Sequence, residues 1–444
     1  MNKLILKNAR IVNENKIFFA DVYIEDKFIA EIGSNITKPN ANTIDLEANY
    51  LLPGVIDDQV HFREPGLTHK ATIATESKAA VAGGITSFIE QPNTIPNAIT
   101  HEILENKYAI AKQSSYANYS FMLGGTNSNL DEILKTNKNN VAGIKLFLGS
   151  STGNMLVDDD EALHKIFSST QLPIALHCED EHTIKENLEH YKSIYGENIP
   201  IEMHPLIRSD KACYLSSSKA IKLAKETGAR IHIFHVSTEL ETHLFANNIP
   251  LENKKITSEV CIHHLWFTDK DYLTKGNLIK WNPAVKTEKD KNALWQALLN
   301  DKIDVVATDH APHTWQEKQN NYSSCPSGAP MVQHALVAML QMHHKHKISL
   351  EKIVEKMCHN PAKIFNIDKR GFIKEGYYAD VVAVNLNKKW RVSKENILYH
   401  CKWSPMKDEE FYSKISHTFV NGNLVYENDK VFNINAGERL LFNR

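Results

Sequence analysis

Several features that would define a class of protein are missing from this sequence of 444 residues. No apolar run approaches the roughly 20 residues that a membrane-spanning helix needs, and the apolar stretch in MNKLILKNARIV is too short for a signal peptide. The sequence also has no strong excess of positive or negative charge. The formal net charge is −2, the pI is about 6.9 and basic residues are scattered. We therefore predict no membrane and no nucleic acid among the partners.

Paired cysteines are missing as well. The six cysteines form no CxxC pair and lie far apart, at Cys178, Cys213, Cys261, Cys325, Cys358 and Cys401. Such spacing favours reduced core residues over disulfides or a zinc knuckle, and it predicts a reducing, cytoplasmic location. Short internal repeats and low-complexity segments are absent too, so the sequence is that of an ordinary globular protein.

The two ends of the chain show the alternation that is typical of short β-strands. The pattern runs through residues 1–52 and returns in residues 371–444, where Asn421 and Gly422 form a dipeptide typical of a hairpin turn. We expect the two ends to meet in space and to form one small sheet domain.

Between these ends, short apolar runs alternate with helical stretches. Eight runs are candidate strands, at residues 54–61, 85–91, 119–124, 143–148, 173–178, 230–236, 256–261 and 303–309. Strands that alternate with helices indicate βα units and a parallel sheet. Eight such units predict an α/β protein whose residues 53–370 form a closed (β/α)8 barrel.

Five of these strands carry a metal-competent group or a lysine close to their carboxyl end. The five residues are His61, Lys145, His177, His235 and Asp309. Taken singly, a buried histidine is more often a hydrogen-bonded core residue than a ligand, and a strand-end aspartate often caps the next helix. Because barrel enzymes do their chemistry at this rim, the five together predict a metal site. Imidazole and carboxylate donors favour zinc, while manganese and cobalt stay open.

Lys145 is the unusual member, because it lies within the apolar run VAGIKLFLG. A buried ammonium group is costly unless it is paired, so one hypothesis is an ion pair with Asp309 or Glu179. The other hypothesis is a carbamate on the lysine nitrogen, which would make the side chain an anionic oxygen ligand able to bridge two metal ions. Burial favours the neutral amine that reacts with carbon dioxide.

A series of motifs carries a resemblance through nearly the whole chain: DDQVHFREPG, QPNT, GIKLFLGSSTGNM, LHCED, IHIFHVST, EVCIHHLWFT, WNPAVK and ATDHAPHT, in this order. They resemble the amidohydrolase superfamily, and most of all the dihydroorotases that are related to hydantoinases and allantoinases. The resemblance implies a metal-dependent (β/α)8 barrel over residues 53–370, with a small β-sandwich assembled from residues 1–52 and 371–444.

The resemblance also implies roles for individual residues. The metal ligands would be His61, carboxylated Lys145, His177, His235 and Asp309. Asp309 would in addition be the general base. The substrate would be held by Arg63, Asn93, Asn282, His313, Ser327 and Gly328. A homodimer is a family-level expectation.

Arg63 points to one substrate among those of the related enzymes. Dihydroorotate carries a carboxylate that a guanidinium group can bind through two hydrogen bonds, whereas allantoin and hydantoins lack it. The implied reaction is therefore the reversible cyclisation of N-carbamoyl-L-aspartate to L-dihydroorotate in pyrimidine biosynthesis. Two other hypotheses stay open: an inactive scaffold that associates with aspartate transcarbamoylase, and a cyclic amidase for another ring.

The sequence departs from the family at its first metal ligand. The family has Asp-x-His-x-His-x-Arg where this chain has DDQVHFR, so Gln59 takes the place of a histidine. An amide oxygen is a poorer zinc donor than imidazole. Either Gln59 binds weakly, or Asp58 or water substitutes, or one metal position stays empty. We expect one or two Zn²⁺ per subunit, with the second site weakened by Gln59.

Further polar residues and two loops are assigned supporting roles. His232 and His310 are expected to make hydrogen bonds around the ligands, and one of His263 and His264 is expected to orient a ligand. The segments GSSTGNMLVDDD and HTWQEKQNNYSSCPSGAP are expected to be lids or walls of the pocket.

Overall fold

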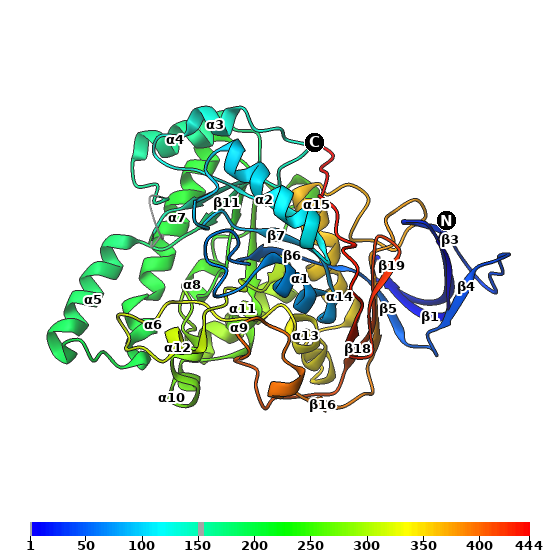
Figure 1. Ribbon diagram of the computed structural model, residues 1–444. Coiled ribbons are helices and arrows are strands. Elements are labelled where there is room, and N and C mark those ends of the chain that lie inside the picture. The colour runs from blue at the N-terminus through cyan, green and yellow to red at the C-terminus, as the bar shows by residue number, and fades with distance from the viewer. Residues whose placement is uncertain (1, 150–154) are drawn as a thin grey trace.

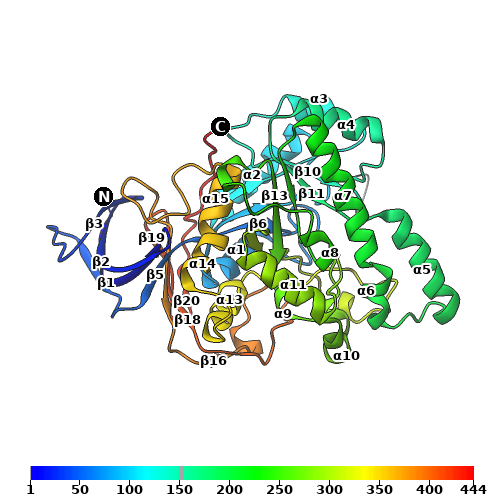
Figure 2. The ribbon, with the colours of Figure 1, turned by 180° about the vertical axis from the view of Figure 1, so that it is seen from behind.

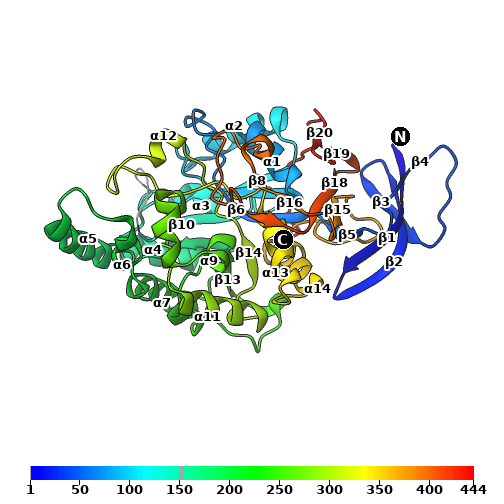
Figure 3. The same ribbon diagram turned by 90° about the horizontal axis from the view of Figure 1, so that it is seen from below.

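The computed structural model describes residues 2–149 and 155–444. Figure 1 shows a barrel surrounded by helices, with a β-sheet unit at one side that contains strands from both ends of the chain. Seen from below, in Figure 3, the strands of the amino-terminal region lie farthest from the barrel. Part of the predicted pocket wall, residues 150–154, lies outside the described residues.

The barrel consists of eight parallel strands, the third of which is interrupted at Met122. Their bounds are β6 (Val55–Val60), β7 (Ile85–Glu90), β8 (Asn118–Phe121) with β9 (Leu123–Gly124), β10 (Ile144–Phe147), β11 (Ile174–His177), β12 (Ile231–Ile233), β13 (Ile256–Cys261) and β14 (Val305–Ala307). The ring closes where Val60 bridges to His310 and the His61 amide donates to the His310 carbonyl at 2.7 Å. The predicted barrel is confirmed.

Helices cover the outside of the barrel, as Figure 2 shows from behind. They are α1 (Ile73–Ala82), α2 (His101–Ser114), α3 (Leu130–Leu134), α4 (Asp160–Ser169), α5 (Glu181–Tyr195), α6 (His204–Ile207), α7 (Asp210–Thr227), α8 (Glu239–Thr242), α9 (Ile262–Trp266), α10 (Tyr272–Lys275), α11 (Glu288–Leu299), α12 (Trp315–Lys318), α13 (Ala335–His344), α14 (Leu350–Val354) and α15 (Asn360–Phe365). The chain supplies its own caps: Ser209 accepts from the Ala212 amide at the start of α7, and Gly228 ends this helix with a φ of 76°. No helix in the described residues is long and apolar enough to cross a membrane.

Both ends of the chain contribute to one nine-stranded sheet. It contains β1 (Lys3–Asn13), β2 (Lys16–Glu25), β3 (Phe28–Gly33), β4 (Asn42–Asp45), β5 (Tyr50–Pro53), β15 (Val381–Asn385), β18 (Lys414–Val420), β19 (Asn423–Glu427) and β20 (Lys430–Val431). A further pair, β16 (Trp390–Arg391) and β17 (Glu410–Phe411), is separate. The ends join where β5 pairs with β15. Asn421 and Gly422, both at positive φ, connect β18 to β19, so the predicted turn is confirmed.

A buried polar network joins this sheet to the barrel. Asn118 in β8 donates to Asp380 at 3.0 Å and accepts from Asn421 at 2.7 Å, and Asp380 pairs with Arg370. Because all four side chains are buried and partnered, the contact is specific as well as apolar. The division of the chain at residues 52/53 and 370/371 stays a prediction.

Candidate active site

A cavity of about 220 Å³ lies at the carboxyl ends of the barrel strands. It is lined by Gln59, His61, Arg63, Asn93, Lys145, Phe147, His177, His235, Trp281, Asn282, Asp309, Ala311, His313, Pro326, Ser327 and Gly328. All the residues that the sequence assigned to metal or substrate are in this wall; their individual roles stay predictions. A larger hollow of about 680 Å³ contains none of them.

The backbone turns sharply where it delivers several of these side chains. His235 and Asp309 each lie two residues beyond a strand, with φ values of 42° and 45°. Arg63 has a φ of 71°. Residues other than glycine rarely occupy this left-handed region, and they do so mainly at functional sites. The strained turns aim the three side chains into the cavity.

The REPG turn after β6 is fixed by its own residues. Gly66 has a φ of 83°, and a Cβ atom there would lie 2.0 Å from the Ile95 carbonyl oxygen. The Glu64 carboxylate accepts from the Ile73 amide at 2.8 Å, at the start of α1. These contacts explain why the motif needs glutamate and glycine directly after Arg63.

One wall of the cavity brings two histidines into contact. His177 Nδ1 lies 2.9 Å from His235 Nε2, and His177 Nε2 lies 3.0 Å from Glu179 Oε2. Glu179 is in turn paired with Arg208. Burial lowers the pKa of both imidazoles, which favours the neutral form that binds metals.

Lys145 belongs to the same wall, and its Nζ faces the rings of Phe147 and Phe234, at 4.9 and 4.0 Å from their centroids. Its side chain is buried, and among the described residues Nζ has neither a hydrogen-bond partner nor an ion pair. The predicted ion pair is therefore wrong: Asp309 contacts His61, and Glu179 contacts His177 and Arg208. Burial lowers the pKa of Lys145 to about 7, although Glu259 and Asp309 act in the opposite direction. A neutral amine is thus accessible near neutral pH.

The opposite wall holds an imidazole between a carboxylate and an amide. His61 Nε2 lies 3.1 Å from Asp309 Oδ1, and His61 Nδ1 lies 2.7 Å from Asn93 Oδ1. Gln59 is buried beside them, with Cys261 Sγ at 3.8 Å from its Oε1. Asp58 does not line the cavity; its carboxylate lies 3.3 Å from His232 Nε2. Substitution of the missing imidazole by Asp58 is therefore not what the structure shows.

Arg63 is a buried cation that also lines the cavity. Its Nε donates to the Pro312 carbonyl at 3.0 Å, and its Nη2 lies 3.0 Å from His313 Nε2. No carboxylate in the described part of the chain lies within 4.0 Å of the guanidinium group. Burial lowers the pKa of Arg63 to about 10, so it stays charged at neutral pH. A charged guanidinium group that lines a cavity and has no carboxylate within 4.0 Å among the described residues is suited to bind an anion.

The supporting histidines have varied positions. His232 donates toward Glu259 and Asp58, and Glu259 accepts from the His235 amide at 3.2 Å, so His232 supports a predicted ligand indirectly. His310 contacts Glu76 at 2.8 Å and the Met331 amide, and it touches no predicted ligand through its ring.

Three residues of the cavity wall were not predicted from the sequence: Phe147, Trp281 and Ala311. Pro326 belongs to the segment HTWQEKQNNYSSCPSGAP that was expected to be a lid or wall. Phe147 could have been found, because it follows Lys145 by two residues in β10 and so shares its face. Trp281 directly precedes Asn282 in the motif WNPAVK, whereas Ala311 lies in a loop, where side-chain direction follows no sequence period.

The donor set fits a metal ion. The predicted ligands line a single cavity of a parallel barrel: three of its four imidazoles, one carboxylate, and a lysine without a hydrogen-bond or ion-pair partner among the described residues. An unpaired buried amine is costly as an ammonium group, and carboxylation would convert it to an anionic donor. The fold and the site thus define a barrel enzyme with a metal-competent rim.

Comparison with known proteins identifies the family. Residues 50–425 match the model of the Amidohydrolase family, and the chain belongs to this family. It is 30% identical to a dihydroorotase of Methanosphaera stadtmanae, over 97% of this chain and 98% of that protein. It is 29% identical to an allantoinase of Desulfitobacterium hafniense, over 98% of each. An L-hydantoinase (dihydropyrimidinase) from Arthrobacter aurescens has a similar structure, with a TM-score of 0.94, 27% identity and coverage of 99% of this chain and 100% of that one.

Proposed function

We propose that the protein is a zinc-dependent dihydroorotase, which interconverts N-carbamoyl-L-aspartate and L-dihydroorotate with release of water during pyrimidine biosynthesis. The observation that carries this proposal is Arg63, a buried cation that faces the cavity without a carboxylate partner among the described residues. Relatives named dihydroorotase that align over nearly the whole chain support the proposal.

The cavity offers complementary groups for the rest of the substrate. The substrate carboxylate would lie against Arg63, with Asn93 and His313 as neighbours on the same side. Asn282 Oδ1 is buried without a hydrogen-bond partner, so it is available to accept from a ring N–H group. Ser327 and Gly328 complete the wall beside the ring.

The residues would divide the chemistry between them. When bound, zinc supplies Lewis acidity that acidifies water and polarises the ring carbonyl. Asp309 takes the proton from the attacking water at its carboxylate and passes it to the ring nitrogen that leaves. His61 Nε2 lies 3.1 Å from Asp309 Oδ1, so the two side chains are close enough to bind one ion. In the direction of synthesis, the same steps run in reverse.

The proposal includes the state and surroundings of the enzyme. His177, His235 and carboxylated Lys145 would hold one zinc ion, whereas His61 and Asp309 would hold a second ion more weakly because Gln59 replaces an imidazole. All six cysteines are free thiols, which supports the proposed cytoplasmic location. A homodimer and association with aspartate transcarbamoylase stay predictions.

A cyclic amidase for another ring is the second candidate. The allantoinase and the L-hydantoinase among the similar proteins favour it, because both are as complete in their alignment as the dihydroorotase. The buried charge of Arg63 argues for an anionic substrate instead, since an uncharged ring would leave the guanidinium group without an anionic partner.

A side-by-side assay tests the proposal. Purified zinc-loaded protein is given dihydroorotate, dihydrouracil and allantoin, with Asp309→Ala as the inactive control. We expect kcat/KM for dihydroorotate to exceed the other two values by about 100-fold, since a charge-assisted bidentate contact contributes about 2–3 kcal/mol. Preference for an uncharged ring would favour the second candidate. No turnover by folded, metal-loaded protein would favour the inactive scaffold.

A further inference from the structure

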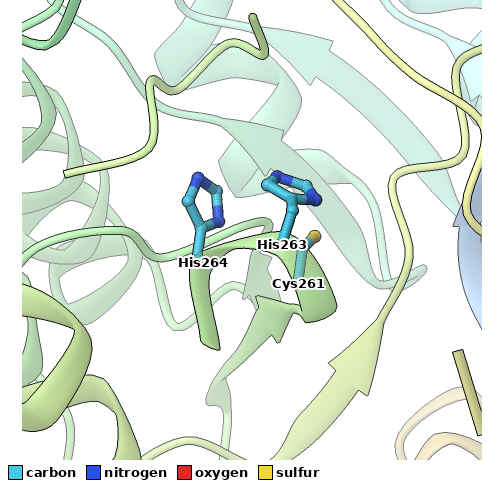
Figure 4. Close-up of side chains that lie close together, drawn as sticks. All are labelled: Cys261, His263 and His264. Atoms are coloured by element: carbon cyan, nitrogen blue, oxygen red, sulfur yellow. The ribbon is translucent and has the colours of Figure 1, made fainter. Parts of the chain in front are cut away.

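A second group of metal-competent side chains lies at the carboxyl end of β13, outside the ligand set predicted from the family. Cys261 is the last residue of β13, and His263 and His264 belong to the first turn of α9. Their donor atoms all lie within 4.8 Å of one another, and all three residues are buried. Figure 4 shows the two imidazoles projecting side by side from this junction, with the sulfur of Cys261 next to His263.

These side chains have unused hydrogen-bonding capacity. Among the described residues, neither ring nitrogen of His263 has a partner with full hydrogen-bond geometry, only the Thr308 backbone close to the ring, and Nδ1 of His264 has no partner. His264 Nε2 lies 3.1 Å from the Pro283 carbonyl. Buried polar atoms are nearly always satisfied, so three orphan nitrogens in two adjacent rings call for an additional partner such as an ion.

The group lies directly behind one wall of the catalytic cavity. Cys261 Sγ lies 3.8 Å from Gln59 Oε1 and 3.9 Å from Glu259 Oε1. The His263 ring stacks on Trp281, with 3.9 Å between the ring centroids. Gln59 and Trp281 both line the cavity. The thiol and the imidazoles are thus next to the position where this chain has lost an imidazole.

We propose that Cys261, His263 and His264 form a metal site that favours zinc and lies beside Gln59. One thiolate and two imidazoles form a donor set that suits tetrahedral zinc, with a fourth position left for water or for the Gln59 oxygen. Binding transfers the thiol proton to solvent, because the thiolate is the ligand. This proposed metal site does not depend on which cyclic substrate the protein hydrolyses.

Cobalt substitution tests this site without any substrate. Metal-free protein is titrated with Co²⁺, and a thiolate ligand gives a thiolate-to-cobalt charge-transfer absorption band. We expect this band in the wild-type protein. In Cys261→Ser the band disappears, and zinc content falls by about one ion per chain after dialysis. His263→Gln weakens the band and lowers zinc retention, which separates loss of a ligand from loss of one cysteine.

Cys358→Ser is the matched control. Cys358 is also buried, but its Sγ donates to the Pro53 carbonyl at 3.3 Å and lies in the π-helical segment Glu355–His359. This variant is expected to keep the band and the zinc content. The proposal is overturned if wild-type protein gives no thiolate band, or if Cys261→Ser and Cys358→Ser retain equal zinc. It is also overturned if anomalous scattering places the ion at the other buried group, Asp58, His232 and Glu259. None of these outcomes involves turnover, so this test and the test of the proposed dihydroorotase activity can fail independently of each other.

Discussion

The two walls of the catalytic cavity differ in how completely they are equipped to bind a metal ion. On one wall, His177 and His235 touch at 2.9 Å and Lys145 has no partner among the described residues. On the other wall, His61 is already paired with Asp309 at 3.1 Å, and Gln59 offers only a neutral amide. On the proposed assignment, carboxylation of Lys145 and one cation would complete the first wall. Metal binding at the second wall would depend on the residues around Gln59.

This difference has a consequence for how the enzyme would work. A tightly held ion on the first wall would be sufficient for basal activity. The second wall would modify the affinity for substrate and the turnover rate. The proposed site of Cys261, His263 and His264, at the junction of β13 and α9, lies beside Gln59 of this wall.

Lys145→Ala is expected to have the largest effect, because it removes the group that would join the two walls. We expect kcat/KM for dihydroorotate to fall about 10³-fold or more, since a ligated metal ion contributes several kcal/mol to the barrier. Zinc content after dialysis is expected to fall as well. Added acetate should restore part of the activity by supplying a carboxylate in the vacated space. Unchanged zinc and unchanged turnover would contradict the role of Lys145.

Arg63→Met is expected to act on substrate affinity and to leave both walls intact. Loss of a bidentate contact worth about 2–3 kcal/mol should raise KM for dihydroorotate about 30- to 100-fold. Methionine keeps the length of the side chain and removes its charge. Zinc content serves as the control and is expected to stay constant. An unchanged KM would argue against carboxylate binding by Arg63.

Carboxylation of Lys145 in metal-free protein is expected to depend steeply on pH. Burial lowers the pKa of this lysine from 10.5 to about 7, so the fold favours the neutral amine. Between pH 8 and pH 6 the neutral fraction falls about tenfold, and the carbamate should fall at least as much. Carbon-13 NMR with labelled carbon dioxide at constant concentration measures it. A carbamate signal that stays constant over this range would contradict the low pKa.

Gln59→His is expected to have the smallest effect, confined to the second wall. Restoring an imidazole should tighten the weaker ion by about tenfold at most. Competition with a chelator measures both affinities, and Gln59→Asn, which keeps the amide, is the control. Two ions that are equally tight in the unmodified protein would show that glutamine does not weaken the second wall.

Much of this cavity could be predicted from the sequence, because the carboxyl ends of the strands in a parallel barrel meet at one rim, where active sites lie. Lys145 was conspicuous as a cation inside an apolar run, and His61 and His177 stand at strand ends. His235 and Asp309 were placed in strands by their sequence, yet both lie two residues beyond strands that are shorter than predicted. Their backbone turns depend on tertiary contacts that no local pattern reveals.

Other parts of the site could not be predicted for a geometric reason. The pairing of β6 with β7 shifts register between Asp57 and Val60, so simple alternation does not show that Asp58 contacts His232 inside the barrel. The group of Cys261, His263 and His264 spans a strand end and a helix start, where neither period applies. Arg63 contacts His313, which is 250 residues away in the sequence, and no local pattern predicts such a contact.

Anomalous diffraction at the zinc edge, from crystals of the full chain grown with zinc and bicarbonate, tests the central claim most directly. The account predicts an ion held by His177, His235 and a carboxylated Lys145. Absence of an ion there, with an unmodified lysine directed away from the cavity, would contradict it.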